Sequence, residues 1–445
     1  MSPKIALFLC ILFILYLFKL DFKTKPNVSI ALWVPLIWLL IISSRMVSLW
    51  FYQNPEDYVD GNPIDPNIFT ALIVIGLLIL LGRKIAWSDV FKGNTWVFIY
   101  FAYCGISILW SDFPDVAFKR YIKAIGSLIM VLIVLTEPAP VEAIKTIIRR
   151  CAYMLIPLSI ILYKYYPSFG RSYHRWSGQM MITGVTTNKN SLGILCLVCG
   201  IIFISDLFSA WRNKRVFDNK HNLIIFIMIM WLLIESNSAT ALLSFVIGIS
   251  ILIGLELPIF KRNLNHLGYY IFFIVCIFIT FELVLNITQT FLFIMGRDAT
   301  LTGRTDIWKL AIGLVTDPLI GTGFESFWLG NRMEYFADKY WFQMNEAHSG
   351  YVEIYLQGGL IGLFLLIVII VSTYKYIYNT LVAHFEYGKL MMLFFALALI
   401  HNITESSFRP LQLMGFIFFL SVVKPPKPIT VSGQGLEPNS MEKFY

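Results

Sequence analysis

Apolar runs recur along almost the whole of this 445-residue chain and are separated by short polar connections. A helix needs roughly 20 apolar residues to cross the hydrocarbon core of a bilayer. The pattern therefore predicts about 12 or 13 membrane-spanning helices, several of them short. The predicted spans are Ile5 to Leu20, Ile30 to Trp50, Ile68 to Leu81, Trp96 to Trp110, Ile122 to Leu135, Ile144 to Tyr163, Ser191 to Trp211, Leu223 to Ile234, Ala239 to Leu255, Leu267 to Phe291, Tyr351 to Val371, Leu390 to Ile400 and Leu411 to Val423.

The composition agrees with a polytopic membrane protein and excludes a soluble one. Hydrophobic residues make up 58% of the chain and charged residues only 14%, and the mean hydropathy is +0.71. We predict an all-α integral membrane protein with a membrane domain over residues 1–423. Residues 424–445 are expected to form a disordered cytoplasmic tail. No cleavable signal is expected, because the first apolar run leads directly into further spans.

Lys and Arg residues in the short loops orient the spans, since basic loops stay on the cytoplasmic side. These residues occupy alternate connections. The acidic stretch 54–65, the segment 164–190 and a large loop over 292–348 therefore fall on the outer face. The net charge of +8 is explained by the basic loops, so no nucleic-acid partner is expected.

The large outer loop contains a predicted helix that begins at Asp306 with Thr305 as its cap. Arg304 lies at its entrance, and we expect the helix to lie along the membrane surface. Further on, Gly321 and Gly323 are a weak signal of a phosphate-binding loop, because the rest of a dinucleotide fingerprint is missing. The apolar stripe of the helix consists of Ile307, Trp308, Ala311, Ile312 and Val315.

The outer segment 164–190 is basic throughout. It contains Lys164, Arg171, Arg175 and Lys189 and has no acidic residue. Uncompensated positive charge on the outer face indicates an anionic partner. Contact with anionic lipid headgroups is one interpretation. The other is a bound phosphate or pyrophosphate, which the forked donors of Arg recognise.

His348 is the one histidine of six that opens a predicted outer helix in a polar context. The positive end of a helix dipole lowers the pKa of an imidazole and favours the neutral form, which accepts a proton. Tyr351 and Tyr355 follow at helical spacing, so we expect the three side chains to share one face toward a cavity. The alternative is an interfacial histidine without a chemical role.

Two further charged residues lie near the outer ends of spans, namely Arg45 and Glu405. Each either lines a cavity or has a structural role. No cofactor or metal is expected, because no convincing cluster of outer carboxylates is evident. The cysteines lie in or beside apolar spans, including the Cys196 and Cys199 pair, so we interpret them as packing residues without disulfides.

Four motifs that follow in order between residues 170 and 365 resemble the signature regions of the O-antigen ligase and O-antigen polymerase superfamily, including exopolysaccharide polymerisation proteins. They are "HRWSGQMMITGVTTNKNSLG", "GRTDIW", "GTGFESF" and "NEAHSGYVEIYLQGGLIGL". The resemblance puts the family's loop histidine on His348 and its two arginines on Arg304 and Arg175. Where many relatives have His-Asn, this chain has His348 and Ser349, so a role of that asparagine does not transfer.

The resemblance implies a glycosyltransferase in the bacterial inner membrane with its active site facing the periplasm. The donor would be a polyprenyl-diphosphate-linked glycan, whose diphosphate Arg175 and Arg304 hold without a metal. His348 would take the proton from an acceptor sugar hydroxyl in an inverting displacement. Further contacts to substrate or membrane lipid are expected from Arg171, Lys189, Asn188, Asn190, Tyr351, Arg45 and Glu405.

Polymerase and ligase share this chemistry and differ in the acceptor. A polymerase must admit a second lipid-linked glycan, for which Arg171 and Lys189 offer additional charge, so we favour it over a ligase that joins glycan to lipid A-core. A transporter of polysaccharide or lipid-linked glycan is the alternative from another class, but it would place polar groups near the middle of the membrane. Polysaccharide export or chain-length-control proteins are the expected protein partners.

Overall fold

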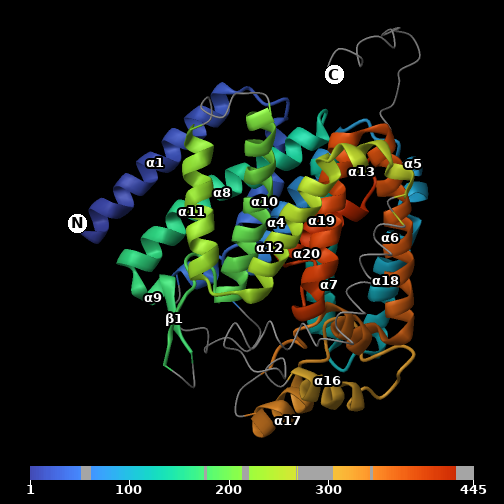
Figure 1. Cartoon of the computed structure of the whole chain (residues 1–445). Coiled ribbons are helices and arrows are strands. Elements are labelled where there is room, and N and C mark those ends of the chain that lie inside the picture. The colour runs from blue at the N-terminus through green and yellow to red at the C-terminus, as the bar shows by residue number, and fades with distance from the viewer. Residues whose placement is uncertain are drawn as a thin grey trace, which may run out of the picture.

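The computed structural model describes residues 1–51, 62–174, 178–212, 220–266, 268, 304–340 and 344–426. Helices dominate this part of the chain and form a bundle (Figure 1). Seven described helices are long and apolar enough to cross a membrane, so the predicted all-α membrane fold is confirmed. They are α1 (Pro3–Lys23), α4 (Ile64–Gly82), α8 (Pro140–Tyr165), α10 (Lys189–Arg212), α12 (Ala239–Glu256), α18 (Gly350–Ala383) and α19 (Phe385–Thr404).

Further helices, all shorter than 18 residues except α7, occupy the other predicted spans. These are α2 (Trp33–Ile42) with the preceding η1 (Ile30–Leu32), α6 (Thr95–Ile106) with the following η3 (Ser107–Trp110), α7 (Pro114–Leu135), α11 (Lys220–Glu235) and α20 (Leu413–Val422). The prediction that one span continues to Trp50 is wrong. Helix α2 ends at Ile42, where polar residues follow, and α3 (Ser48–Phe51) is a separate turn. The predicted span Leu267 to Phe291 lies outside the described residues.

The remaining elements lie at the two ends of the bundle. Figure 1 shows α16 (Arg304–Gly313) and α17 (Gly330–Tyr340) at one end, which we call the loop face. Helices α5 (Trp87–Gly93) and α13 (Pro258–Arg262) lie at the opposite end, and η5 (Leu264–His266) follows α13. We call that end the basic face.

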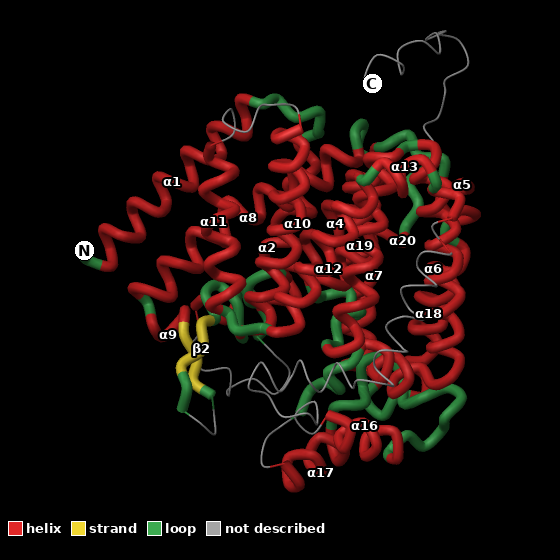
Figure 2. The backbone as a smooth tube through the Cα atoms, viewed as in Figure 1, coloured by secondary structure: helices red, strands yellow, loops and turns green. Residues whose placement is uncertain are grey.

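The predicted basic segment 164–190 folds into the only strands of the described chain. Helix α9 (Pro167–Gly170) leads into β1 (Arg171–Tyr173), which pairs antiparallel with β2 (Met180–Ile182), as the strand colouring of Figure 2 shows. The register sets Arg171 opposite Ile182. Arg175 lies in the connection between the strands, outside the described residues.

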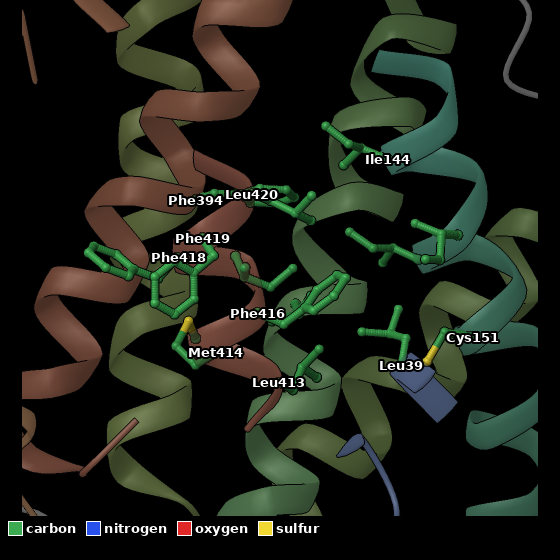
Figure 3. Packing of buried hydrophobic residues seen from close by; sticks show 14 of the residues in the cluster. Leu39, Ile144, Cys151, Phe394, Leu413, Met414, Phe416, Phe418, Phe419 and Leu420 are labelled. Atoms are coloured by element: carbon green, nitrogen blue, oxygen red, sulfur yellow. The ribbon is translucent and has the colours of Figure 1, made fainter. Parts of the chain in front are cut away.

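The main apolar core runs through the centre of the bundle, around α20. Figure 3 shows Phe416, Phe418 and Phe419 of this helix among side chains from neighbouring helices. Helix α20 is only 10 residues long, but nearly all of its side chains are buried. Close packing on all sides, rather than length, therefore holds this short helix in place.

A second, smaller core holds the loop face together. It joins α16 and α17 to the start of α18 through Ile307, Ala311, Phe327, Trp328, Phe336, Met344, Ala347 and Leu356. The predicted stripe of α16 is confirmed for Ile307 and Ala311, but Ile312 is 43% exposed. The predicted cap is wrong, because α16 already includes Arg304 and Thr305.

Helix α18 is broken at Gly359, whose φ of 59° is left-handed and outside the helical region. The loop 317–323 inserts there and takes up the interrupted backbone hydrogen bonds. The N–H groups of Thr322 and Gly323 donate to Leu356 O and Gln357 O, and those of Leu360 and Ile361 donate to Pro318 O and Leu319 O. Irregular backbone inside a bundle is tolerated when it is paired in this way.

These contacts overturn the phosphate-loop interpretation of Gly321 and Gly323. The Gly321 N–H donates to Asp317 O and the Gly323 N–H to Gln357 O, so neither is available to a phosphate. An added Cβ at Gly321 would lie 2.6 Å from the backbone of Gln357. Glycine is therefore needed here for close approach of loop and helix, and for the positive φ of both residues.

We predict that the loop face and the basic face lie on opposite sides of the membrane. Cysteines introduced at the exposed Lys309 in α16 and Lys375 in α18 should react with a membrane-impermeant maleimide from opposite sides. Five of the six native cysteines, at positions 10, 104, 151, 196 and 199, are buried and contribute little background, and the sixth, Cys276, which lies outside the described residues, is replaced by serine in the background chain. Labelling of both new cysteines from the same side would refute this topology.

Candidate active site

The segment that contains His348 enters α18 with a sharp turn. His348 has a φ of 52°, a left-handed conformation that is uncommon for residues other than glycine. The N–H of Ser349 donates to Ser406 Oγ at 3.1 Å, and the N–H of Gly350 donates to Glu405 O at 3.0 Å. The loop after α19 therefore satisfies backbone donors at the start of α18 and brings Glu405 next to His348.

His348 lies between two carboxylates. Its Nδ1 is 3.2 Å from Glu346 Oε1 and 3.6 Å from Glu405 Oε2, as an ion pair rather than an aligned hydrogen bond. The other carboxylate oxygen of Glu405, Oε1, accepts a hydrogen bond from Asn190 Nδ2 at 3.0 Å and lies 3.5 Å from Arg304 Nη2. We call these five residues the histidine cluster.

The histidine cluster is assembled from distant parts of the chain. Asn190 is the second residue of α10, Arg304 begins α16 and Glu405 follows α19. Arg304 is held by a second contact, since its Nη1 donates to the carbonyl oxygen of Thr404. Four residues predicted separately from the sequence, Asn190, Arg304, His348 and Glu405, are thus brought together.

The carboxylates raise the pKa of His348. Burial disfavours the charged imidazolium, but the close contacts and charges of Glu346 and Glu405 outweigh it and raise the pKa of His348 to about 9. The prediction of a lowered pKa from the helix dipole is therefore wrong. Two carboxylates within 4 Å exceed the effect of a helix terminus.

Glu346 forms an ion pair with His348, and its own pKa is shifted as well. Burial opposes its ionisation, but His348, Arg409 and Arg304 stabilise the charged form and lower the pKa of its carboxyl group. Glu346 and His348 are therefore an ionised pair at neutral pH. Sequence analysis missed Glu346, although its place two residues before His348 in a polar stretch was an available signal.

We expected no cluster of carboxylates on the outer face, and this expectation is wrong. The donor atoms of Glu346, His348 and Glu405 all lie within 4.8 Å of one another, a spacing compatible with three ligands of a metal ion. The neighbouring guanidinium of Arg304 and the raised pKa of His348 oppose a cation there, because a metal needs neutral imidazole. The surroundings therefore favour a protonated histidine over a metal ligand.

A buried carboxylate fixes the segment from which Glu346 and His348 project. The side chain of Glu353 is 4% exposed and accepts hydrogen bonds from four groups. The donors are Trp328 Nε1 at 3.0 Å, Ala347 N at 3.0 Å, Gln357 Nε2 at 2.9 Å and Arg409 Nη2 at 2.7 Å. Arg409 Nη2 also donates to Asn345 O at 3.1 Å. Both Glu353 and Arg409 were missed, although charged residues beside apolar spans are a signal of such a role.

Arg45, proposed as a substrate contact, makes the contacts of the structural alternative. Its guanidinium donates to the carbonyl oxygens of Phe169, Gly184, Val185 and Thr186 and so holds both ends of the hairpin segment. Arg171 also has a local contact, since its Nε donates to Tyr163 O at 2.9 Å.

The remaining predicted residues lie in α10 and α18 or beside them. Asn188 Oδ1 accepts the N–H of Ser191 and caps the start of α10, of which Lys189 is the first residue. The Tyr351 hydroxyl donates to Leu399 O. Tyr351 packs on the main core and Tyr355 on the loop-face core, so the prediction of a shared face with His348 is wrong.

Comparison with known proteins bears on the same region. Residues 223–367 match the family model described as O-antigen ligase. The chain is similar to the exopolysaccharide production protein ExoQ of Rhizobium meliloti strain 1021, with 25% identity over 298 residues. That alignment covers 63% of this chain and 64% of ExoQ, so the chain matches just under two thirds of the length of this relative. The family match includes Arg304, Glu346 and His348.

We predict that removing the Glu353 carboxylate destabilises the fold. Glu353→Ala leaves Arg409 without its partner, and breaking a buried ion pair costs about 3 to 5 kcal/mol. The free energy of unfolding in detergent measures this loss. Glu386→Ala, at a carboxylate that is 58% exposed, is the matched control and should cost less than about 1 kcal/mol. Equal losses in both variants would contradict the role given to Glu353.

We also predict that Glu346 controls the protonation of His348. Acylation by diethyl pyrocarbonate, which requires neutral imidazole, should reach half its maximal rate at about pH 9 for His348. Glu346→Gln should move this midpoint to lower pH, whereas Glu334→Gln on the exposed side of α17 should not.

The same protonation stabilises the fold. Since the folded-state pKa exceeds the ordinary value of 6.5, the contribution of His348 is complete below about pH 6.5 and is lost as the pH rises through about 9. A thermal midpoint that is insensitive to pH over this interval, together with an unshifted acylation profile in Glu346→Gln, would contradict the pairing.

Proposed function

Because the family match and the similarity to ExoQ confirm the resemblance to the O-antigen ligase and polymerase superfamily, we propose that this protein is a membrane glycan polymerase or ligase. Its donor is a glycan linked to polyprenyl diphosphate, and its acceptor is a sugar hydroxyl. The observation that carries the proposal is the histidine cluster, in which a paired imidazole and a guanidinium meet at the loop face. In this proposal the loop face is periplasmic.

His348 acts as the general base. Its Nδ1 faces Glu346 and Glu405, so Nε2 is the nitrogen that receives the proton of the acceptor hydroxyl. The carboxylates hold the proton on Nδ1 and stabilise the imidazolium that forms, as the acidic member of a catalytic triad does. Glu346 and Glu405 are therefore positioning residues for the base.

Bond making and bond breaking occur on opposite sides of the anomeric carbon. The acceptor oxygen forms a bond to this carbon as it loses its proton to His348. The bond from the carbon to the diphosphate oxygen breaks, and the electron pair leaves with polyprenyl diphosphate. One direct displacement inverts the configuration at the anomeric carbon.

Arg304 stabilises the leaving diphosphate. Its guanidinium is already at the histidine cluster, where it neutralises part of the Glu405 charge. Forked donors to phosphate oxygens stabilise the charge that develops as the bond breaks. The sequence motifs assign Arg175 to the same task, and this assignment stays a prediction because Arg175 lies outside the described residues.

The raised pKa has a consequence for catalysis. With a pKa of about 9, His348 is mostly protonated at neutral pH, and only the neutral form can accept a proton. Transfer is therefore expected to speed up as the pH rises toward about 9. A base with a high pKa is also a stronger base once it is neutral, which partly offsets its low population.

We predict that His348→Ala lowers the rate of glycan transfer by a factor of about 100 or more, because general-base catalysis contributes about that much. Purified protein, a polyprenyl-diphosphate-linked glycan and an acceptor glycan provide the assay. His384→Ala removes an exposed histidine at the end of α18 and should leave the rate unchanged.

The pH profile supplies the second readout of this experiment. The rising limb of the native protein should move to lower pH in Glu346→Gln. Substantial transfer by His348→Ala, with the pH profile unchanged, would show that His348 is not the base.

A further inference from the structure

Helix α7 carries three cations at and just before the start of the predicted span Ile122 to Leu135. Its 22 residues are long enough to cross a membrane, and the stretch from Ala124 to Leu135 is almost entirely buried. Its first three turns, however, contain Lys119, Arg120 and Lys123. We call these three residues the α7 cations.

The α7 cations lie toward the loop face. Just before α7, Asp112 pairs with Arg332 of α17 at 2.5 Å. Arg120 donates to the carbonyl oxygen of Glu325 in the loop that inserts beside α18. At the other end of α7, Arg83 donates to Ile133 O. The α7 cations therefore enter the bundle from the side that holds the histidine cluster.

No carboxylate within the described ranges lies at ion-pair distance from the α7 cations. Asp65 has the largest Coulombic effect on Lys123 among the acidic groups. Its carboxylate accepts hydrogen bonds from the backbone N–H and the hydroxyl of Ser48. Three other buried or half-buried cations of the bundle do have carboxylate partners: Arg150 pairs with Asp21, Lys145 with Asp206 and Lys389 with Glu256. Among the described residues, the α7 cations therefore carry positive charge that no ion pair neutralises and that an anionic ligand would neutralise.

The surface around these cations is suited to a lipid. Phe118 is 54% exposed and Ile122 is 38% exposed, and both alternate with the lysines on the outward side of α7. The exposed Leu78 of the neighbouring α4 lies further along, where α4 packs on the part of α7 around Ile129 and Ile133. Lys119 is exposed, and the ammonium of Lys123 lies 5.6 Å from the ring centre of Phe69. An anionic headgroup beside an apolar surface is the chemistry of a membrane lipid.

A hydrogen-bonded chain connects this surface with the histidine cluster. From Arg120 it passes through Glu325, whose N–H donates to Gln357 Oε1 at 3.2 Å. Gln357 donates to Glu353, which also accepts the N–H of Ala347, the residue before His348. The α7 cations are therefore linked through this chain to the segment that carries His348.

We propose that Lys119, Arg120 and Lys123 bind the diphosphate of a lipid-linked acceptor glycan, with its lipid chain along Phe118 and Ile122. The inference rests on the proposed function and specifies it, because two carrier sites are what a polymerase needs. Arg304 serves the donor diphosphate and the α7 cations serve the acceptor diphosphate. The sequence suggested Arg171 for the second carrier, and that assignment stays a prediction.

Lipid binding to the full chain tests the inference without requiring activity. Native mass spectrometry of the purified protein, titrated with polyprenyl diphosphate, should show two molecules bound per chain. Lys119→Gln with Lys123→Gln should weaken one of them by about tenfold or more, the loss expected for a charge-assisted contact. Arg304→Gln should weaken the other. Lys119→Arg with Lys123→Arg should restore two-site binding.

The matched control removes the same charge from the same face. Lys309→Gln with Lys339→Gln neutralises two exposed lysines of α16 and α17 and should keep both sites. Two molecules bound with undiminished affinity to the α7 double variant would overturn the inference. Competition by an equal concentration of phosphatidylglycerol would also overturn it, because the site would then hold bulk lipid headgroups.

Transfer kinetics separate this inference from the proposed function. The KM for a lipid-linked acceptor should rise about tenfold in the α7 double variant. The KM for the donor, and transfer to an acceptor glycan without diphosphate, should stay unchanged. If the α7 double variant is active and its KM for the acceptor is unchanged, the proposed acceptor site is refuted and the proposed transferase function stands. If the native protein binds two molecules of polyprenyl diphosphate but transfers no glycan, the proposed transferase function is refuted and the two binding sites stand.

Discussion

The buried carboxylate of Glu353 is the contact on which the loop face depends. Taking a carboxylate out of water is costly unless donors replace the lost hydration. Trp328, Ala347, Gln357 and Arg409 provide these donors, from three separate segments of the chain. One side chain therefore joins the loop-face core, the segment before α18 and the loop after α19. The positions of Glu346 and His348 follow from that junction.

The break in α18 also supports this junction, because it lets the loop 317–323 pack into the helix. At Gly359 the helix gives up its own hydrogen bonds and exchanges them with the loop 317–323. This loop leads into Phe324 and Glu325, which are held against η3, α7 and α18. A continuous helix would leave the loop no backbone partners. The glycines of this region therefore have a structural role. The proposed chemistry depends on the charged side chains of the histidine cluster.

Electrostatic balance at the histidine cluster joins stability to the proposed chemistry. Two carboxylates and one guanidinium surround one imidazole, so protonating His348 brings the charges of the cluster to balance. The proposed transfer begins with neutral His348 and ends with the imidazolium that Glu346 and Glu405 stabilise. The most favourable charge state of the cluster is therefore reached as the acceptor loses its proton, when charge also develops on the diphosphate.

The sequence by itself determined the membrane fold, because a bilayer demands long apolar runs and each run is visible without knowledge of its neighbours. It also identified Asn190, Arg304, His348 and Glu405 one at a time, from polarity, charge and motif. Only the tertiary structure decided that these four meet, since residues 190 and 405 are brought into contact by helix packing and by no local period. The same packing decided that Arg45 holds a loop, that carboxylates raise the pKa of His348 and that the α7 cations lack ion-pair partners in the described chain. The charge state and role of a polar side chain depend on the residues that it contacts, and the tertiary structure determines which residues those are.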